Sequence, residues 1–282
     1  MTQTVITYGK AHVVFYRLGG KDVAPLAAAV DVDVFGERFL AAYTEGDNRD
    51  VVATDTMKNF IYAMAAEYAG RTLVGLCAFL GRRFLATYPV MERLRVSARE
   101  VPLDPTSGER VPSEVLFRMS RADAAVAEVT VDASAAGGIV AARSGWKDMA
   151  LLKTTGSSFS SFARDDYTTL PELIDRPLTI RMDAYWRYAD LRDAVADGPG
   201  FLGPRAVREE IERTFHEFNS RSIQHLVHEM GGRLLAAHPQ LADVEFAAEN
   251  HTPDHVHDGA SGVKVFAEPR QTFGKIGLVL RR

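Results

Sequence analysis

An internal duplication is the feature that most constrains how this chain can fold. One apolar helical pattern ends in the segment Phe-Leu-Ala-Thr-Tyr-Pro at 84–89, and a second ends in Leu-Leu-Ala-Ala-His-Pro at 234–239. Each segment is followed by an alternating, strand-like pattern, carried by Leu94 and Val96 in the first copy and by Val244 and Phe246 in the second. Two copies of one motif predict two related units. We expect each to read strand, strand, helix, helix, strand, strand.

Two amphipathic helices are predicted in each copy. Apolar residues recur at the spacing i, i+3, i+4, i+7, which gathers them on one helix face. The four stripes are Met57, Phe60, Ile61, Met64 and Tyr68; Leu73, Leu76, Cys77, Leu80 and Phe84; Val207, Ile211, Phe215 and Phe218; and Ile223, Leu226, Val227, Met230 and Leu234. The helices are therefore grouped in pairs rather than alternating with single strands.

The predicted strands have one apolar face. Val30, Val32 and Val34 alternate with aspartates, and residues 178–186 show the same period of two. Two glycines at 137 and 138 separate two further strand-like runs and favour a hairpin. Grouped strands and grouped helices indicate an α+β fold with antiparallel sheets covered by helices on one face. Burial of the other face would favour an oligomer.

Composition narrows the class of protein. The chain has 282 residues, 46% of them hydrophobic, and we expect a first unit at 1–140 and a second at 141–282. A net charge of −4 disfavours nucleic acid as a partner, and the single Cys77 excludes an intrachain disulfide. The polar first residues, the lack of a long apolar run and the ending Leu280-Arg281-Arg282, which is no peroxisomal signal, predict a cytoplasmic protein without membrane contact.

Residue patterns alone leave the chemistry open. The chain has no glycine-rich phosphate loop, no Gly-x-Ser-x-Gly elbow and no His-Glu-x-x-His. His251, His255 and His257 lie close together and could bind a metal, but we favour a polar loop. Phe159, in a serine-rich stretch, could simply close the edge of the core. Arg176 could form a surface ion pair with the preceding aspartate.

Three separated stretches carry more information. They are Tyr8-Gly9-Lys10, Val52-Ala53-Thr54-Asp55-Thr56-Met57-Lys58-Asn59, and a long segment from Leu152 through Lys153-Thr154-Thr155-Gly156-Ser157-Ser158-Phe159, Phe162 and Arg164 to Glu172, ending in Asp175-Arg176. Together with Asn219-Ser220 and Ile223-Gln224, they resemble the urate oxidase (uricase) family over nearly the whole chain. The long segment is the most specific of these matches.

The resemblance implies both a fold and a reaction. The fold would be a tandem T-fold, with two ββααββ units in each chain and four chains assembled so that their sheets form a tunnel. This agrees with the duplication. The reaction would be oxidation of urate by O₂ and water to 5-hydroxyisourate and H₂O₂, with no cofactor and no metal.

The resemblance also assigns roles to residues near the N-terminus. Lys10 and Thr54 would form a proton-relay pair. Thr54 and Asp55 would present backbone groups to urate from a neighbouring subunit. The active site would then be shared between two chains of a homotetramer.

A second set of residues would bind the purine. Phe159 would stack on the flat ring. Arg176 would offer a planar fork to a carbonyl and a ring nitrogen of anionic urate. Gln224, which can donate and accept at once, would bind the opposite edge, and Ile223 would add a backbone group.

One motif departs from the family pattern. Asn250 would hold O₂ or the attacking water above the ring. The family usually has Asn-x-His here, whereas this chain has Asn250-His251-Thr252. Either His251 takes the histidine's catalytic role after a local shift, or Thr252 replaces it and the relay is changed.

Two other functions fit parts of the sequence. The first is another T-fold enzyme acting on purines or pterins with zinc, although the lone Cys77 disfavours a zinc site that contains cysteine. The second is a T-fold binding module without catalysis, which the altered Asn-His-Thr motif would suit. Direct measurement of urate consumption distinguishes all three.

Overall fold

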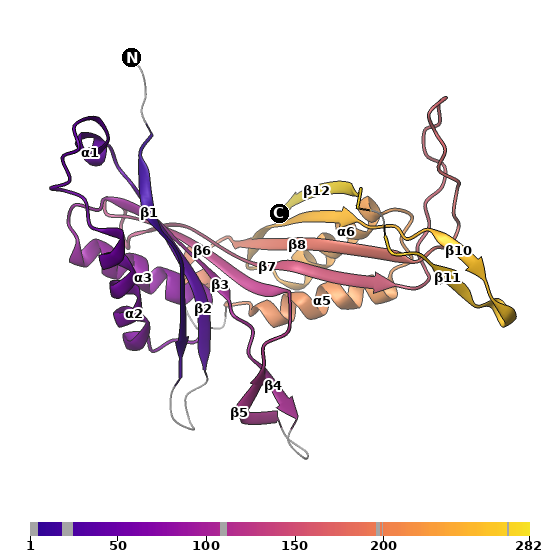
Figure 1. Ribbon diagram of the computed structural model, residues 1–282, viewed down its shortest axis with the longest axis horizontal. Helices are drawn as coiled ribbons and strands as arrows, with labels where there is room; N and C mark the ends of the chain where they lie inside the picture. Colours follow the sequence, from indigo (N-terminus) through magenta and orange to yellow (C-terminus); the bar gives the residue numbers. More distant parts are fainter. Residues whose placement is uncertain (1–4, 19–24, 108–111, 196–197, 199, 270) are drawn as a thin grey trace. The chain divides into compact units, whose positions relative to one another are not determined.

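The computed structural model describes residues 5–18, 25–107, 112–195, 198, 200–269 and 271–282 (Figure 1). Its strands are β1 (Thr7–Arg17), β2 (Leu26–Phe35), β3 (Arg93–Glu100), β4 (Asp104–Ser107), β5 (Pro112–Arg118), β6 (Ala124–Asp132), β7 (Ile139–Lys153), β8 (Leu178–Tyr188), β9 (Leu241–Asn250), β10 (His255–Asp258), β11 (Lys264–Phe266) and β12 (Gly274–Arg281). Its helices are α1 (Leu40–Thr44), α2 (Thr54–Glu67), α3 (Leu73–Thr87), α4 (Leu191–Val195), α5 (Pro204–Glu217) and α6 (Ile223–Ala237). The predicted order of two strands, two long helices and two strands occurs twice, and the α+β class is confirmed.

The chain divides into two compact units. The first unit comprises residues 1–145 and 187–201, and the second comprises 146–186 and 202–282. Strands β7 and β8 each begin in one unit and end in the other.

The first unit is an antiparallel sheet backed by helices. Its strands follow the order β1-β2-β3-β6, with β7 next to β6. Val30, Val32 and Val34 are at most 1% exposed, and the aspartates between them face the other side, as predicted. Helix α3 packs on β3 and β6, and α2 packs on β1, so the helices cover one face (Figure 1).

The second unit repeats this arrangement. Its strands follow the order β7-β8-β9-β12, and α6 packs on β9 and β12. The predicted alternation in β8 is confirmed, because every second residue from Leu178 to Trp186 is at most 2% exposed. Helix and sheet approach closely at equivalent glycines in both units. A Cβ at Gly81 would lie 2.9 Å from Val131, and one at Gly231 would lie 2.6 Å from Leu280.

Two short hairpins and one short helix were not predicted from the sequence. Two short hairpins, β4–β5 and β10–β11, lie between the last two long strands of each repeat, and the short helix α1 precedes α2. The predicted hairpin between β6 and β7 is present, with positive φ at Gly137 and Gly138.

Cys77 is fully buried, as expected for a small apolar residue, and burial raises the pKa of its thiol. None of the helices that the structure describes is long and apolar enough to cross a membrane.

Candidate active site

A carboxylate ties together the two ends of the long loop between β7 and β8. Asp175 accepts hydrogen bonds from Thr155 Oγ1 at 2.7 Å and from the Gly156 amide at 2.8 Å. The hydrogen bond from Thr155 is the largest cause that holds the pKa of the Asp175 carboxyl below its usual value, against the opposing effect of burial. Backbone hydrogen bonds from Gly156, Ser157 and Arg176 lower it further. The carboxylate therefore stays ionised and fixes the exit of the loop to its entry.

Arg176 lies at the end of this loop with only 8% of its surface exposed. Its Nη1 donates to Thr252 Oγ1 at 3.2 Å, and its guanidinium carbon lies 5.5 Å from the centroid of the Phe159 ring. Its Nε is buried and has no hydrogen-bond partner among the described residues. Burial lowers the pKa of the guanidinium, but an arginine starts so high that it stays charged. The interpretation of Arg176 as a surface ion-pair residue is therefore wrong, and a buried cation with an unpaired donor suits an anionic ligand.

The backbone and a second ring hold Phe159 in place. Its amide donates to the Leu173 carbonyl at 2.8 Å, and its carbonyl accepts from the Leu173 amide at 2.9 Å. Its ring stacks on Phe162, with centroids 4.9 Å apart and planes inclined by 11°. These contacts fix the plane of a half-buried aromatic ring next to Arg176, where it could pack against a flat ligand.

The segment before α6 is joined to the same loop. The Ser220 carbonyl accepts from the Ser158 amide at 2.8 Å, and Ser220 Oγ donates to Ser157 Oγ at 3.2 Å. Helix α6 begins three residues later, with Ile223 buried and Gln224 exposed in its first turn. These bonds link the start of α6 to the loop that carries Phe159.

Thr252 of the Asn-His-Thr motif contacts Arg176 and also contacts Asn250. Asn250 is the last residue of β9. Thr252 Oγ1 donates to Asn250 Oδ1 at 3.1 Å and accepts from Arg176 Nη1. A continuous chain of hydrogen bonds therefore runs from the guanidinium through the hydroxyl to the amide.

The remaining residue of the motif makes different contacts. The Nε2 atom of His251 lies 2.9 Å from Glu249 Oε2, and its ring lies 4.8 Å from the ring of Phe273. Its side chain is 12% exposed. The His251 side chain thus contacts Glu249 and Phe273, whereas Thr252 is the residue that bonds to Asn250 and Arg176.

In the first unit, β1 carries Lys10 beside a close approach of two strands. Lys10 is opposite Val32 of β2, and a Cβ on the preceding Gly9 would lie 1.8 Å from the Val32 carbonyl oxygen, so glycine is required there. His12 has φ of 58° and its amide donates to Asp31 Oδ1 at 2.6 Å. The strand register shifts directly after Lys10. Bulges of this kind often lie next to functional sites because they redirect side chains.

The start of α2 lies near Lys10. Thr54 is the first residue of α2 and is exposed. Asp55 pairs with Lys58, whose hydrogen bond and charge lower the pKa of the carboxyl, and the charge of Lys10 lowers it further. Lys10 therefore lies close enough to the first turn of α2 for its charge to act on Asp55.

Comparison with known proteins decides the family. The sequence model of the uricase family matches residues 6–129 and 142–277. The chain belongs to the uricase family. Similarity therefore extends across both units rather than resting on the three motifs alone.

Several relatives and solved structures are similar over this whole length. A uricase of Halalkalicoccus jeotgali is 37% identical over 292 residues, covering 95% of each protein. A uric acid degradation bifunctional protein of Bacillus subtilis is 34% identical over 95% of this chain, which spans only 59% of that longer protein. The crystal structure of a uricase from Bacillus fastidious superposes with a TM-score of 0.93 at 35% identity, covering 99% of this chain and 94% of the other. The tandem T-fold expected from the resemblance is thus confirmed.

In this member of the uricase family, the predicted site residues form two groups. The second-unit cluster consists of Phe159, Arg176, Asn250 and Thr252, which contact one another in turn, and of Ile223 and Gln224, which follow the segment that Ser220 joins to the Phe159 loop. The first-unit cluster consists of Lys10, Thr54 and Asp55. His251 belongs to the second unit, but its side chain contacts Glu249 and Phe273.

Several residues in or beside the matching stretches support the site without belonging to the predicted set. Lys153 donates from Nζ to the Phe218 carbonyl at 2.9 Å, and burial lowers the pKa of its ammonium group. Asp175 closes the loop, and Ser157 joins the loop to Ser220. All lie in or beside the matching stretches, but no periodic pattern marks them because their partners are remote in sequence.

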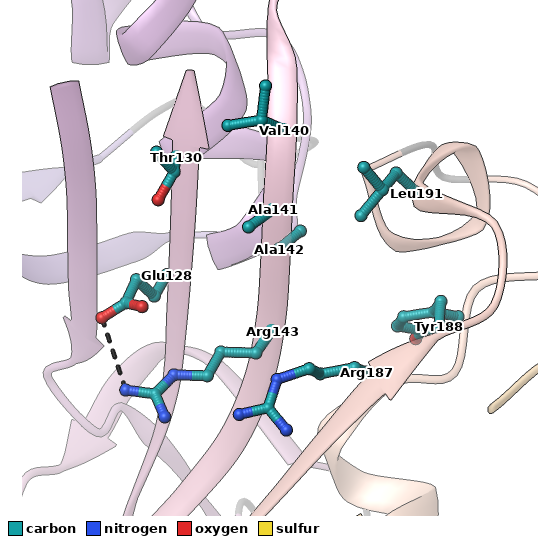
Figure 2. Close-up of a pocket in the computed structure, with 9 residues that line it drawn as sticks. All are labelled: Glu128, Thr130, Val140, Ala141, Ala142, Arg143, Arg187, Tyr188 and Leu191. Atoms are coloured by element: carbon teal, nitrogen blue, oxygen red, sulfur yellow. Dashed lines mark hydrogen bonds and ion pairs between the residues drawn. The ribbon is translucent and has the colours of Figure 1, made fainter. Parts of the chain in front are cut away.

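A separate cavity of about 360 Å³ lies in the first unit (Figure 2). It is lined by Glu128, Thr130, Val140, Ala141, Ala142, Arg143, Arg187, Tyr188 and Leu191. Figure 2 labels Arg143 and Arg187 among the residues that line this cavity, and Arg143 Nη2 lies 3.4 Å from Glu128 Oε2. None of the predicted site residues lines this cavity. Among the described residues, no group of three or more His, Cys, Asp or Glu side chains is placed to hold a metal ion.

Proposed function

We propose that this chain is a urate oxidase that works without a cofactor, converting urate, O₂ and water to 5-hydroxyisourate and H₂O₂. The observation that carries the proposal is the buried Arg176, with its unpartnered Nε beside the Phe159 ring, in a member of the uricase family. A planar anion with carbonyl and ring-nitrogen edges matches this pair.

Substrate binding follows from the second-unit cluster. The Arg176 guanidinium donates to a urate carbonyl and an adjacent ring nitrogen, and the negative charge of urate strengthens both bonds. The Phe159 ring packs against the purine plane. Gln224 binds the opposite edge, and the Ile223 backbone adds one contact.

The chemistry needs proton acceptors and a place for oxygen. Two electrons and two protons leave urate and appear in H₂O₂, and water then adds to the oxidised ring to give 5-hydroxyisourate. Lys10 and Thr54 relay protons, and Asn250 holds O₂ or water above the ring. Thr252 is the better candidate for the position of the family histidine, because it bonds to Asn250 and Arg176 whereas the His251 ring contacts Glu249 and Phe273.

We further propose a homotetramer in which each site combines two chains. Lys10, Thr54 and Asp55 belong to one unit, and the last two of these residues would present backbone groups to urate. The other urate-binding residues belong to the other unit, which supports sites completed by a neighbouring subunit. The two T-fold units are proposed to divide at 140/141. A cytoplasmic location stays a prediction.

The test is direct measurement of urate consumption together with H₂O₂ formation. Purified protein is expected to consume one urate for each H₂O₂ formed, before and after treatment with a chelator. Absence of urate consumption would contradict the proposal. Activity that chelator abolishes and one metal restores would favour the zinc alternative.

A further inference from the structure

The hydrogen-bond chain from Arg176 through Thr252 to Asn250 has a direction that donor counting determines. An arginine only donates, so Thr252 Oγ1 accepts from Nη1 at 3.2 Å. The hydroxyl has one proton, and it goes to Asn250 Oδ1 at 3.1 Å. We propose that Thr252 is a positioning residue that orients both the Arg176 fork and the Asn250 amide; this proposal rests on the proposed urate oxidation.

The first consequence concerns which edge of Arg176 meets the substrate. Thr252 engages Nη1, which leaves the edge formed by Nε and Nη2. Nε is the buried atom that has no partner in the part of the chain described. The two donors on this edge are parallel and match a carbonyl next to a ring nitrogen. Thr252 therefore selects the side-on edge of the guanidinium for urate.

The second consequence concerns the direction of the Asn250 amide. Because Oδ1 accepts the Thr252 proton, the NH₂ group of Asn250 is turned away from Thr252. Two donors are then free to hold O₂, peroxide or water, all of which accept hydrogen bonds. Without the hydroxyl, no contact among those described distinguishes the two orientations of this amide.

The position of Thr252 relative to its neighbour supports this role. Asn250 and Thr252 are two residues apart, and their side chains hydrogen-bond to each other. The His251 side chain between them contacts Glu249 and Phe273 instead. A histidine at 252 would titrate near neutral pH, but a threonine does not. Thr252 thus acts here through the direction of its hydrogen bonds and not by taking a proton from urate.

Four variants separate the hydroxyl from the shape of the side chain. Thr252→Val keeps the shape and removes the hydroxyl. Thr252→Ser keeps the hydroxyl and removes the methyl group. Thr252→Ala replaces Thr252→Val should the valine variant not fold. Thr272→Val, at an exposed threonine of the same unit, is the matched control.

Three quantities are measured on folded protein: the urate Kd without oxygen, the KM for O₂ at saturating urate, and kcat. Loss of one charged hydrogen bond predicts a urate Kd raised roughly ten- to hundredfold in Thr252→Val. The KM for O₂ should rise and kcat should fall in the same variant. Thr252→Ser should keep all three quantities within about threefold of the wild-type values, since the hydroxyl is preserved. Thr272→Val should have the wild-type values.

Each result supports or overturns the proposal. Equal urate Kd and KM for O₂ in wild type and Thr252→Val would overturn it. Equal damage in the serine and valine variants would also overturn it, because the methyl group would then be the important part. A wild type that consumes no urate contradicts the proposed function instead, and the Kd measured without oxygen still tests the orientation of Arg176.

Discussion

The two repeats share one framework. Helices α2 and α5 have 14 residues each, and α3 and α6 have 15 each. Both first strands contain a non-glycine residue with positive φ, His12 in β1 and Asp148 in β7. In each, its amide donates to an aspartate on the next strand, Asp31 or Asp183. Positions in one repeat can therefore be matched to positions in the other.

The matched positions of the proposed relay differ in chemistry. Lys10 lies two residues before His12, and Trp146 lies two residues before Asp148. Thr54 begins α2, and Pro204 begins α5. In the second repeat, Trp146 Nε1 donates to the Pro204 carbonyl at 2.6 Å. A partly buried structural hydrogen bond thus occupies the place where the first repeat has an amine and a hydroxyl.

The reverse holds for the urate-binding positions. Gln224 is exposed at the second position of α6, whereas Val74 at the second position of α3 is 1% exposed. Asn250 ends β9 and bonds to Thr252, whereas Glu100 ends β3 and pairs with Arg121 at 3.0 Å. Each repeat has polar groups where the other has packing or an ion pair. Neither repeat alone contains a complete set, which is why we propose that two chains complete each site.

The largest expected effect tests this division directly. Lys10→Met and Arg176→Ala are each expected to lower kcat/KM by about a hundredfold or more, as loss of a proton-transfer group or a charged clamp does. Refolded together at equal ratio, the two variants should regain on the order of a quarter of wild-type activity, because randomly mixed chains pair an intact Lys10 half with an intact Arg176 half at that frequency.

The control for this experiment is each variant refolded alone at the same total concentration. Hetero-oligomers are verified by a tag on one variant. Verified hetero-oligomers without recovered activity would mean that single chains build complete sites. The proposal that two chains complete each site would then be wrong.

The next effect sharpens the role of the second repeat. Arg176→Lys keeps the positive charge but loses the planar fork and the bond to Thr252. Urate binding should weaken by roughly 1.5–3 kcal/mol, the usual worth of a hydrogen bond to a charged group. Arg164→Lys, an exposed arginine on the same loop, is the matched control. An unchanged urate Kd for Arg176→Lys would show that the Arg176 guanidinium does not bind urate.

Periodic burial explains which parts could be predicted from sequence. The long helices and the strands around Val32 and Ile180 bury one face, and burial repeats at the period of the element. The resemblance supplied the identities of the site residues. The contacts of the site connect distant residues, such as Thr155 with Asp175 and Arg176 with Thr252, and no local pattern encodes them.

The Asn-His-Thr motif shows this limit most clearly. Sequence left open whether His251 or Thr252 takes the family position. The choice depends on where β9 ends and which side chain then points toward Arg176, and only the fold provides that information. The hairpins β4–β5 and β10–β11 were missed for a related reason, because four residues or fewer in β4, β10 and β11 are too short to show a period.

A smaller effect is expected at the structural counterpart of Lys10. Trp146→Phe removes the hydrogen bond to the Pro204 carbonyl but keeps an aromatic ring in a buried place. Stability should fall by about 1 kcal/mol, or roughly 2–4 °C in melting temperature. The kcat of folded protein should not change. A loss of kcat without a loss of stability would show that this position is catalytic in both repeats.

The smallest effect concerns the carboxylate that closes the loop of the second repeat. The pKa of Asp175 is lowered in the folded state, so its contribution to stability is present above the unfolded pKa of about 3.9 and is lost as pH falls through the lower folded pKa. Because the group is largely exposed, Asp175→Asn should cost under about 1 kcal/mol at pH 7. The difference in melting temperature between wild type and variant, measured at fixed protein concentration, should shrink toward zero below about pH 4. Asp166→Asn, an exposed carboxylate on the same loop, is the control. A difference that stays constant from pH 7 to pH 3 would show that the charge of Asp175 does not hold the loop that carries Phe159.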